Sequence, residues 1–406
     1  MRTIFPCSYY LPETAASLYL TDNIIHSCAE SNVEVDLYTP TPTRGVPDGA
    51  VWDRHEVHCN GKLHIYRFHM YGEGKNPILR AFRYILCEFY LTYKCLFAKY
   101  DVAFIDSTPP IQGLKNPLIK LFRRKHVVYN AQDIFPDSLV GTGLAKKDGV
   151  LWKIGRVIEK ITYRYSDKII VISEDFKRNI MAKGVPEEKI VVVYNWVDEE
   201  AVKPINKGDN PLFEELNINR DKFTIVYAGN LGHAQNVQIL IDTANQLKEQ
   251  EDIQFIIFGT GGLETQYKNY IQKNGITNIT FHPLQPYEKV SQVYGIGDVC
   301  IVSCKEGLGG SAMPSKTWSI MSSGRAVLAN FDEGDLKGIL ESNNCGIFTK
   351  AGDKEAFKQA ILDLYRDKAQ CEQLGRNGRE FILKNLTRAV GTQKYVDVIK
   401  SFEKKI

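Results

Sequence analysis

Short apolar runs alternate with helical patterns along the whole of this chain, and this alternation limits its possible folds more than any other feature. The runs are rich in β-branched and aromatic residues, as strands buried on both faces must be. They cover residues 34–38, 102–105, 127–130, 168–172 and 190–194, and then 223–228, 254–258, 279–282, 299–303 and 326–329. Strands separated by helices form parallel sheets with helices packed on their faces. We therefore expect an α/β fold.

The two series of runs indicate two domains, because a chain of 406 residues is too long for a single hydrophobic core. After Val202 the composition becomes polar and includes Pro204, Gly208 and Pro211, which is typical of an interdomain linker. We expect an N-terminal domain over residues 1–202 and a C-terminal domain over residues 203–386.

Charge and cysteine content limit the partners and the compartment. Lys and Arg total 51 against 48 Asp and Glu, and a net charge of +3 provides no general attraction to nucleic acid. Nine cysteines without a Cys-x-x-Cys pair favour free thiols and a cytoplasmic location. The first residues lack the apolar stretch of a signal peptide, and no apolar window reaches the length of a membrane span.

A β-hairpin is expected at the edge of the first sheet, because Asn60-Gly61 favours a tight type I′ turn between two strand-like runs. This turn pairs His64 with Val57, places His55 diagonally on the same face and leaves His58 on the other. Only two of these histidines can converge, so no metal site is expected there. No Asp-x-Asp motif lies in a convincing strand-end loop either, and we expect neither a metal nor another cofactor.

Three glycine-rich loops follow strands of the second half. They are 229–232, 259–262 and 307–310, the last leading through Pro314-Ser315-Lys316 into a helical pattern. One such loop is often only a tight turn, but three at strand ends favour a nucleotide diphosphate site, since glycine lets the backbone approach an anion. The spacing of a dinucleotide fingerprint is absent from both halves, and so is a Walker loop.

Several segments resemble family-4 retaining glycosyltransferases. In the second half these are Gly229-Asn230-Leu231-Gly232 with Gln235, Phe258-Gly259-Thr260-Gly261, and Pro314-Ser315-Lys316 ahead of Met321-Ser322-Ser323-Gly324-Arg325. In the first half they are Tyr9-Tyr10-Leu11-Pro12-Glu13, Ser107-Thr108-Pro109-Pro110, Gln132-Asp133-Ile134-Phe135-Pro136-Asp137-Ser138 and Asn195-Trp196-Val197-Asp198. Their order and spacing are similar to the branch that includes amino-sugar transferases of bacterial O-antigen and capsule assembly.

The resemblance implies a GT-B fold, in which two Rossmann-like domains have parallel sheets that face a central cleft. It implies a UDP- or GDP-linked sugar in the C-terminal domain and a saccharide or lipid-linked acceptor in the N-terminal domain. A last helix, about 387–406, is expected to pack back on the N-terminal domain. The implied donor-binding residues are Gly229, Asn230, Gly232, Gln235, Gly259, Gly261, Ser311, Met313, Pro314, Ser315 and Ser319, and the implied acceptor-binding residues are Glu13, Thr14, Gln132, Pro136 and Asp137.

This chain lacks carboxylates and cations that members of the family usually have. Ser311 and Ser319 occupy the places of two family glutamates, and Glu306 is either a substitute acid or a solvated loop residue. The usual Arg and Lys after the first glycine loop are missing too. Lys316, at the start of a helix, is therefore the candidate that neutralises the diphosphate, with a surface lysine as the alternative.

In the first half the acidic candidate is Asp133, which follows a strand and could orient or deprotonate the acceptor hydroxyl. The alternative is an Asx turn or helix cap before Pro136. A neighbouring family position often holds histidine, but here that place is Gln132, so a histidine-based mechanism is not expected.

Aromatic and basic residues mix along the helical stretch 80–99, as suits a peripheral contact with the inner face of a membrane. Arg123-Arg124-Lys125 could extend that basic rim. The alternative is a core-packing helix whose basic side chains reach solvent.

These features predict a retaining hexosyl- or N-acetylhexosaminyltransferase of bacterial surface polysaccharide assembly: O-antigen and lipopolysaccharide, capsule or exopolysaccharide. Two alternatives stay open. One is a nucleotide-sugar 2-epimerase of similar fold, and the other is a catalytically inactive subunit that binds a nucleotide-sugar, which the serines at the glutamate positions favour.

Overall fold

The computed structural model describes residues 1–13, 18–43, 45–72, 76–141, 145–311 and 313–403. The chain divides into two compact units. Unit 1 holds Met1–Asn195 and Ala389–Ile406, and unit 2 holds Trp196–Arg388. The polar segment after Val202 lies inside unit 2, where Lys203 N donates to Ser291 Oγ at 2.9 Å and Arg325 donates to the Ile205 carbonyl at 2.6 Å.

Unit 1 is built on an eight-stranded sheet of the order β3-β4-β2-β1-β5-β6-β7-β8, in which β3 is antiparallel to its neighbour and all other described pairs are parallel. Its strands are β1 (Arg2–Pro6), β2 (Glu34–Pro40), β3 (His55–His58), β4 (Leu63–Phe68), β5 (Val102–Asp106), β6 (His126–Ala131), β7 (Lys168–Val171) and β8 (Ile190–Val192). Its helices are α1 (Leu18–Glu30), α2 (Pro77–Phe97), α3 (Lys115–Leu118), α4 (Asp137–Gly141), α5 (Val150–Arg164), α6 (Glu174–Ala182) and α15 (Arg388–Lys400), with the short turns η2 (Pro110–Leu114) and η3 (Ile119–Arg123).

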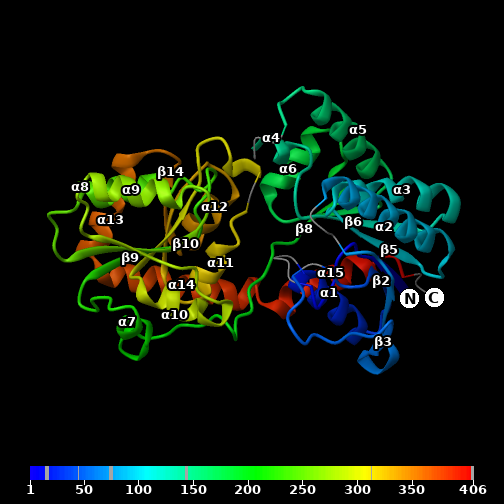
Figure 1. Ribbon diagram of the computed structural model, residues 1–406, viewed down its shortest axis with the longest axis horizontal. Coiled ribbons are helices and arrows are strands. Elements are labelled where there is room, and N and C mark those ends of the chain that lie inside the picture. The colour runs from blue at the N-terminus through cyan, green and yellow to red at the C-terminus, as the bar shows by residue number, and fades with distance from the viewer. Residues whose placement is uncertain (14–17, 44, 73–75, 142–144, 312, 404–406) are drawn as a thin grey trace. The chain divides into compact units, whose positions relative to one another are not determined.

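The helices of unit 1 form two layers, one on each face of the sheet. The connections through α2, α5 and α6 all progress across the sheet in one direction, and right-handed crossovers therefore place these helices together on one face. The connection through α1 runs the other way, and α1 lies with α15 on the opposite face (Figure 1). Tyr395 of α15 packs against Phe104 of β5, with ring centroids 6.0 Å apart.

The predicted hairpin is confirmed as an edge feature. Val57 pairs with His64 in the predicted register, and the His55 and His64 rings lie stacked 5.4 Å apart. The turn itself differs, because Cys59 already has a positive φ of 51° and ends the strand before Asn60-Gly61. The connection is therefore a short 3₁₀ segment, η1 (Cys59–Gly61), rather than a two-residue turn.

Unit 2 is built on a six-stranded parallel sheet of the order β11-β10-β9-β12-β13-β14. Its strands are β9 (Phe223–Asn230), β10 (Ile253–Thr260), β11 (Ile279–His282), β12 (Val299–Ser303), β13 (Ala326–Phe331) and β14 (Gly346–Lys350). Its helices are α7 (Leu212–Glu215), α8 (Gln238–Gln246), α9 (Glu264–Lys273), α10 (Val290–Ile296), α11 (Lys316–Ser322), α12 (Asp335–Ser342), α13 (Lys354–Arg366) and α14 (Lys368–Asn385).

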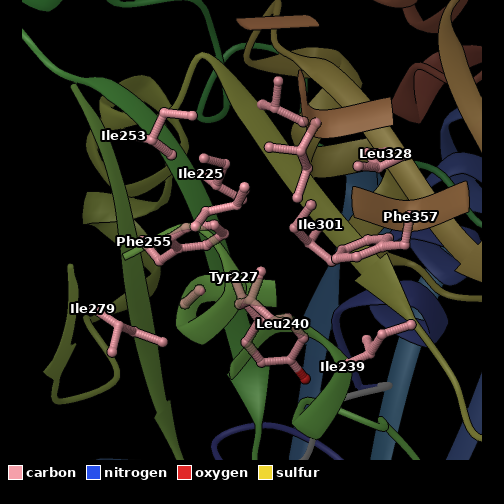
Figure 2. Close-up of a cluster of buried hydrophobic side chains, with 14 of the residues drawn as sticks. Ile225, Tyr227, Ile239, Leu240, Ile253, Phe255, Ile279, Ile301, Leu328 and Phe357 are labelled. Atoms are coloured by element: carbon pink, nitrogen blue, oxygen red, sulfur yellow. The ribbon is translucent and has the colours of Figure 1, made fainter. Parts of the chain in front are cut away.

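The core of unit 2 lies between this sheet and the helices α8, α9 and α13. Ile225 and Tyr227 of β9, Phe255 of β10 and Phe357 of α13 are almost fully buried in it (Figure 2). Full burial of such side chains stabilises a fold by roughly 1.5–3 kcal/mol each. This packing fixes the positions at which β9, β10 and β12 end, and those ends carry the glycine loops.

None of the helices in the described residues combines the length and apolarity that a membrane span requires.

Candidate functional site

Each sheet has one place where consecutive connections leave in opposite directions. In unit 1 it lies between β1 and β5, and in unit 2 between β9 and β12. Ligands of open parallel sheets bind beyond the carboxyl ends of the strands at such a switch point. The strand order alone therefore predicts one ligand-binding position in each unit.

The predicted glycine loops of unit 2 meet at its switch point. Gly229 and Gly259 are register partners at the ends of β9 and β10. A Cβ on Gly259 would lie 2.3 Å from the Gly229 carbonyl oxygen, and one on Gly261 would lie 2.7 Å from the Leu231 backbone. Glycine at 259 and 261 is thus required by the close approach of two backbone segments. The loop after β12 joins them through its start, because Lys305 N donates to the Ala234 carbonyl at 2.8 Å, whereas the amides of its Gly307 and Gly309 donate to the Asp332 carboxylate.

Lys316 sends its ammonium group into this cluster of loops. It is the first residue of α11, yet its Nζ lies 4.1 Å from the centroid of the Tyr227 ring on β9. A Cβ on Gly229 would lie only 2.7 Å from that Nζ, so glycine at this position leaves room for the lysine. The side chain as a whole is half-buried, but Nζ itself is buried and has no hydrogen-bond partner among the described residues. Burial lowers the pKa of Lys316 to about 8.

A buried cation without an anionic partner is costly, and the contact of Lys316 with the Tyr227 ring replaces only part of the hydration that its ammonium group has lost. The polar groups of unit 2 that are buried without a hydrogen-bond partner in the described part of the chain also include Gln235 Oε1, on the loop after β9, and Thr317 Oγ1, next to Lys316 in the sequence. Such unsatisfied groups are typical of sites that are completed by a ligand. The arrangement suits a polyanion with hydroxyl or amide groups, as a nucleoside diphosphate has.

The other predicted donor-side residues occupy the surrounding loops. Asn230 is exposed, and its carbonyl accepts from Tyr227 Oη at 2.8 Å. Gly232 lies over the side chain of Gln235, because a Cβ there would be 2.9 Å from Oε1. Met313, Pro314 and Ser315 lead into α11, and Ser319 is half-buried within it. Ser311 ends the 3₁₀ turn η7 (Gly309–Ser311), and Glu306 is exposed in the loop after β12.

Unit 1 has a small polar pocket at its own switch point, with a volume of about 120 Å³. Asp106, the last residue of β5, lies in its wall and is half-buried. Its carboxylate accepts from Asn130 Nδ2 at 2.7 Å and from Thr21 Oγ1 at 3.5 Å. Burial raises the pKa of Asp106 to about 6, in spite of these two donors. Ser8 and Gln132 also line this pocket, which we call the Asp106 pocket.

Helix α15 supports the wall of the Asp106 pocket through Tyr395. Tyr395 Oη donates to Asn130 Oδ1 and accepts from Gln132 Nε2, both at 3.2 Å. Gln132 Oε1 in turn accepts from Asn195 Nδ2 at 2.9 Å. The predicted residue Gln132 is therefore a fixed part of the wall, oriented by three neighbours.

The remaining predicted acceptor-side residues are spread over the same edge of unit 1. Asp133 is exposed, and no hydrogen bond to it is found within the described ranges. Glu13 is buried and accepts from Thr43 N at 2.8 Å, as a carboxylate that anchors a loop does. Pro136 is buried against Gly155 of α5. Thr14 lies outside the described residues.

Asp137 is engaged in an ion pair. Burial raises its pKa, but the Lys183 ammonium at 2.7 Å outweighs burial, and the net shift of the Asp137 pKa is downward. The carboxylate of Asp137 therefore has a structural role in this ion pair.

Sequence reasoning missed Asp106, although a signal was present. The run Val102–Asp106 is apolar except for its last residue, and an acid that ends a buried strand must face the carboxyl edge of the sheet. The same rule selected the glycine loops. Asp106 lies one strand away from the predicted Asp133 and, unlike Asp133, lines the pocket.

One group of side chains in the described residues could hold a metal ion: His26 and Glu30 of α1 with Cys59 of the β3–β4 turn. It is partly exposed and lies at the amino edge of the sheet of unit 1, away from the Asp106 pocket.

Comparison with known proteins assigns each half of the chain to a family model. Residues 20–201 match the family model described as Glycosyltransferase Family 4, and residues 209–381 match the model described as Glycosyl transferases group 1. The chain is a GT-B glycosyltransferase. The family and fold expected from the motifs are thereby confirmed, whereas the amino-sugar branch and the retention of configuration stay predictions.

Relatives of this glycosyltransferase are distant. The probable glycosyltransferase WbjE of Pseudomonas aeruginosa is 23% identical over 74% of each chain. WcaI of Escherichia coli (strain K12), named for colanic acid biosynthesis, is 29% identical over 50% of each chain. Among solved structures, HepE of Anabaena in complex with UDP has a TM-score of 0.72 at 16% identity, over 99% of this chain and 100% of HepE. HepE has also been solved with UDP-glucose. These structural likenesses establish the GT-B fold.

Proposed function

We propose that this glycosyltransferase transfers a hexosyl or N-acetylhexosaminyl group, with retention, from a nucleotide-sugar bound in unit 2 to an acceptor bound in unit 1. The observation that carries the proposal is the buried, unpartnered Lys316 Nζ among the glycine loops. A full positive charge held without a partner matches a leaving group that gains negative charge as the glycosidic bond breaks. UDP is the favoured nucleotide, since HepE has been solved with UDP, and GDP is the alternative.

The acceptor in this proposal is a saccharide or lipid-linked saccharide of bacterial surface polysaccharide assembly. The name of WcaI, which refers to colanic acid biosynthesis, supports that role. Its reacting hydroxyl enters the Asp106 pocket and donates to the Asp106 carboxylate, which orients the oxygen. Asp133, exposed after the neighbouring strand, is the candidate that takes the proton. The nine free cysteines support a cytoplasmic reaction.

The donor site is proposed to work without a divalent ion. Lys316 supplies the charge that a metal would otherwise supply, and the amides of the loops after β9 and β12 supply hydrogen bonds. Glu306 is the acid nearest in sequence to these loops and is proposed to face the transferred sugar.

The test is incubation with a panel of UDP- and GDP-sugars. Slow release of nucleoside diphosphate supports a transferase, interconversion of the sugar supports an epimerase, and tight binding without turnover supports an inactive subunit. Lys316→Ala is expected to lower turnover about a hundredfold, equal to about 3 kcal/mol, and to weaken donor binding less. Lys305→Ala is the matched control, because Lys305 is an exposed lysine of the loop after β12. Near-normal turnover of a folded Lys316→Ala protein would contradict the donor site.

A further inference from the structure

Exposed large apolar side chains are concentrated in unit 1. In the described part of unit 2 they are only Leu284, Tyr287 and Leu383. In unit 1 most of them lie on three neighbouring segments: Ile78, Leu79, Phe82, Ile85, Phe89, Tyr93 and Phe97 on α2; Ile111, Leu114, Leu121 and Phe122 on η2 and η3; and Val150, Leu151, Ile154 and Val157 on α5. A soluble monomer rarely exposes so many apolar side chains together, and such a patch marks an interaction surface.

These three segments belong to a single layer. α2 packs against η3, and α3, which precedes η3 directly, packs against α5, all on the same face of the sheet (Figure 1). α2 carries apolar side chains on two faces, one turned toward the sheet and one exposed. Cys87, Leu91 and Cys95 are buried against the sheet, whereas Phe89 is 70% exposed. The alternative of a purely core-packing helix is therefore wrong for α2.

The same layer is strongly basic, although the whole chain is nearly balanced with 51 basic and 48 acidic residues. The basic residues of segments 76–99, 110–125 and 145–165 are Arg80, Arg83, Lys94, Lys99, Lys115, Lys120, Arg123, Arg124, Lys125, Lys146, Lys147, Lys153, Arg156, Lys160 and Arg164. Their acidic residues are Glu88, Asp148 and Glu159. Glu88 is neutralised by Lys115, and Glu159 by Arg156 and Lys183. The uncompensated charge of the layer is positive.

A pocket of about 570 Å³ lies within this layer, between α5 and the loop after α6. Lys160, Arg164 and Lys189 line it, together with the exposed apolar residue Val157. Lys160 and Arg164 are exposed and form no ion pair in the described part of the chain. Two available cations beside an apolar side chain offer a place for a phosphate group attached to an acyl chain.

We propose that the outer surface of α2, η3 and α5 docks on an anionic lipid bilayer, and that the pocket beside α5 takes a lipid phosphate headgroup. Apolar side chains enter the acyl boundary while the cations meet anionic headgroups, a combination that stable peripheral binding requires. A second copy of the chain fits this surface poorly. A two-fold interface sets a surface against itself, and here it would oppose two uncompensated positive layers.

Flotation with vesicles tests the proposal on the full chain. We expect it to float with vesicles that contain phosphatidylglycerol, to remain in the soluble fraction with pure phosphatidylcholine, and to be released by high salt. Phe89→Glu with Phe122→Glu, and separately Lys160→Glu with Arg164→Glu, should each reduce binding at least tenfold. The matched control is Lys248→Glu with Lys273→Glu, two exposed lysines of unit 2, which should leave binding unchanged.

Separate readouts distinguish this proposal from the proposed function. Release of nucleoside diphosphate in solution should be unchanged in all three double variants, because none touches either candidate site. Inorganic phosphate at the headgroup concentration should not displace the protein, and displacement would show a free-phosphate site instead. Vesicle binding that does not depend on lipid charge would overturn the proposal. So would a dimer in analytical ultracentrifugation that dissociates in the Phe89→Glu with Phe122→Glu variant.

Discussion

Lys316→Met should make the protein more stable while weakening its binding of a nucleotide. In the unliganded protein, burial holds the pKa of Lys316 at about 8 instead of 10.5. At 1.36 kcal/mol for each pKa unit, the buried charge costs roughly 3 kcal/mol at pH 7. Methionine keeps the apolar stem but loses the cation–π contact with Tyr227, worth roughly 1 kcal/mol. The net expectation is a gain of about 2 kcal/mol.

The assay is thermal and urea unfolding of wild type and variant, with and without UDP. A gain of about 2 kcal/mol raises the Tm of a unit of this size by about 4–8 °C. The stabilisation by UDP should be smaller in the variant than in the wild type, because the charge that attracts the diphosphate is gone while the loop amides remain. Lys305→Met, an exposed neighbour, should change neither quantity.

The pH dependence gives the refuting result. Below pH 8 the lysine is protonated in both the folded and unfolded states, and the full cost is present. Between pH 8 and 10.5 the folded state releases the proton first, so wild-type stability rises with pH relative to the variant, and the gap closes. A variant less stable than wild type at pH 7, or a gap that does not shrink above pH 8, would refute the buried-charge argument.

Three further predictions concern the two sites. Donor affinity measured by calorimetry should fall as pH rises above about 8, because Lys316 must then be protonated before it can bind the diphosphate. Binding in this range should be accompanied by proton uptake. An affinity that stays constant from pH 7 to 10 would contradict this prediction. Asp106→Asn should be about 1–3 kcal/mol more stable than wild type at pH 7 and equal to it near pH 4. The wild type loses stability as pH rises from about 4 toward 6, because the Asp106 carboxyl holds its proton more tightly in the folded protein than in the unfolded chain. The same variant should transfer sugar to the acceptor at least tenfold more slowly while releasing nucleotide from the donor at the normal rate, and equal losses in both would assign Asp106 a purely structural role. Transfer activity should persist in EDTA, and a loss that magnesium or manganese restores would count against a donor site charged by Lys316 alone.

The periodicity of apolar residues was sufficient to predict the fold class, because a strand buried on both faces cannot be polar. The runs at 279–282 and 299–303 coincide with β11 and β12. Strand β14 (Gly346–Lys350) was not predicted, because in Gly-Ile-Phe-Thr-Lys only two large apolar residues stand together. So short an apolar run carries little signal of a strand.

For the candidate site, the sequence predicted which loops converge but not what each residue does there. Gly229, Gly259 and Gly261 do meet, yet the last two serve the contact between backbones, a role that spacing alone does not reveal. The importance of Lys316 was predicted from missing cations elsewhere. Its burial over Tyr227 depends on packing between β9 and α11, residues almost ninety positions apart, and no local pattern encodes such a contact.

The discontinuity of unit 1 has a consequence for biogenesis. The ribosome must complete all of unit 2 before α15 emerges, which takes roughly 10–40 s at typical elongation rates. Until then Asn130 and Gln132 lack the phenol of Tyr395 that bridges them. A nascent or prematurely terminated chain can therefore fold unit 2 while the wall of the Asp106 pocket still lacks this support. Translation itself sets the order in which the two candidate sites mature, and the candidate site of unit 1 matures last.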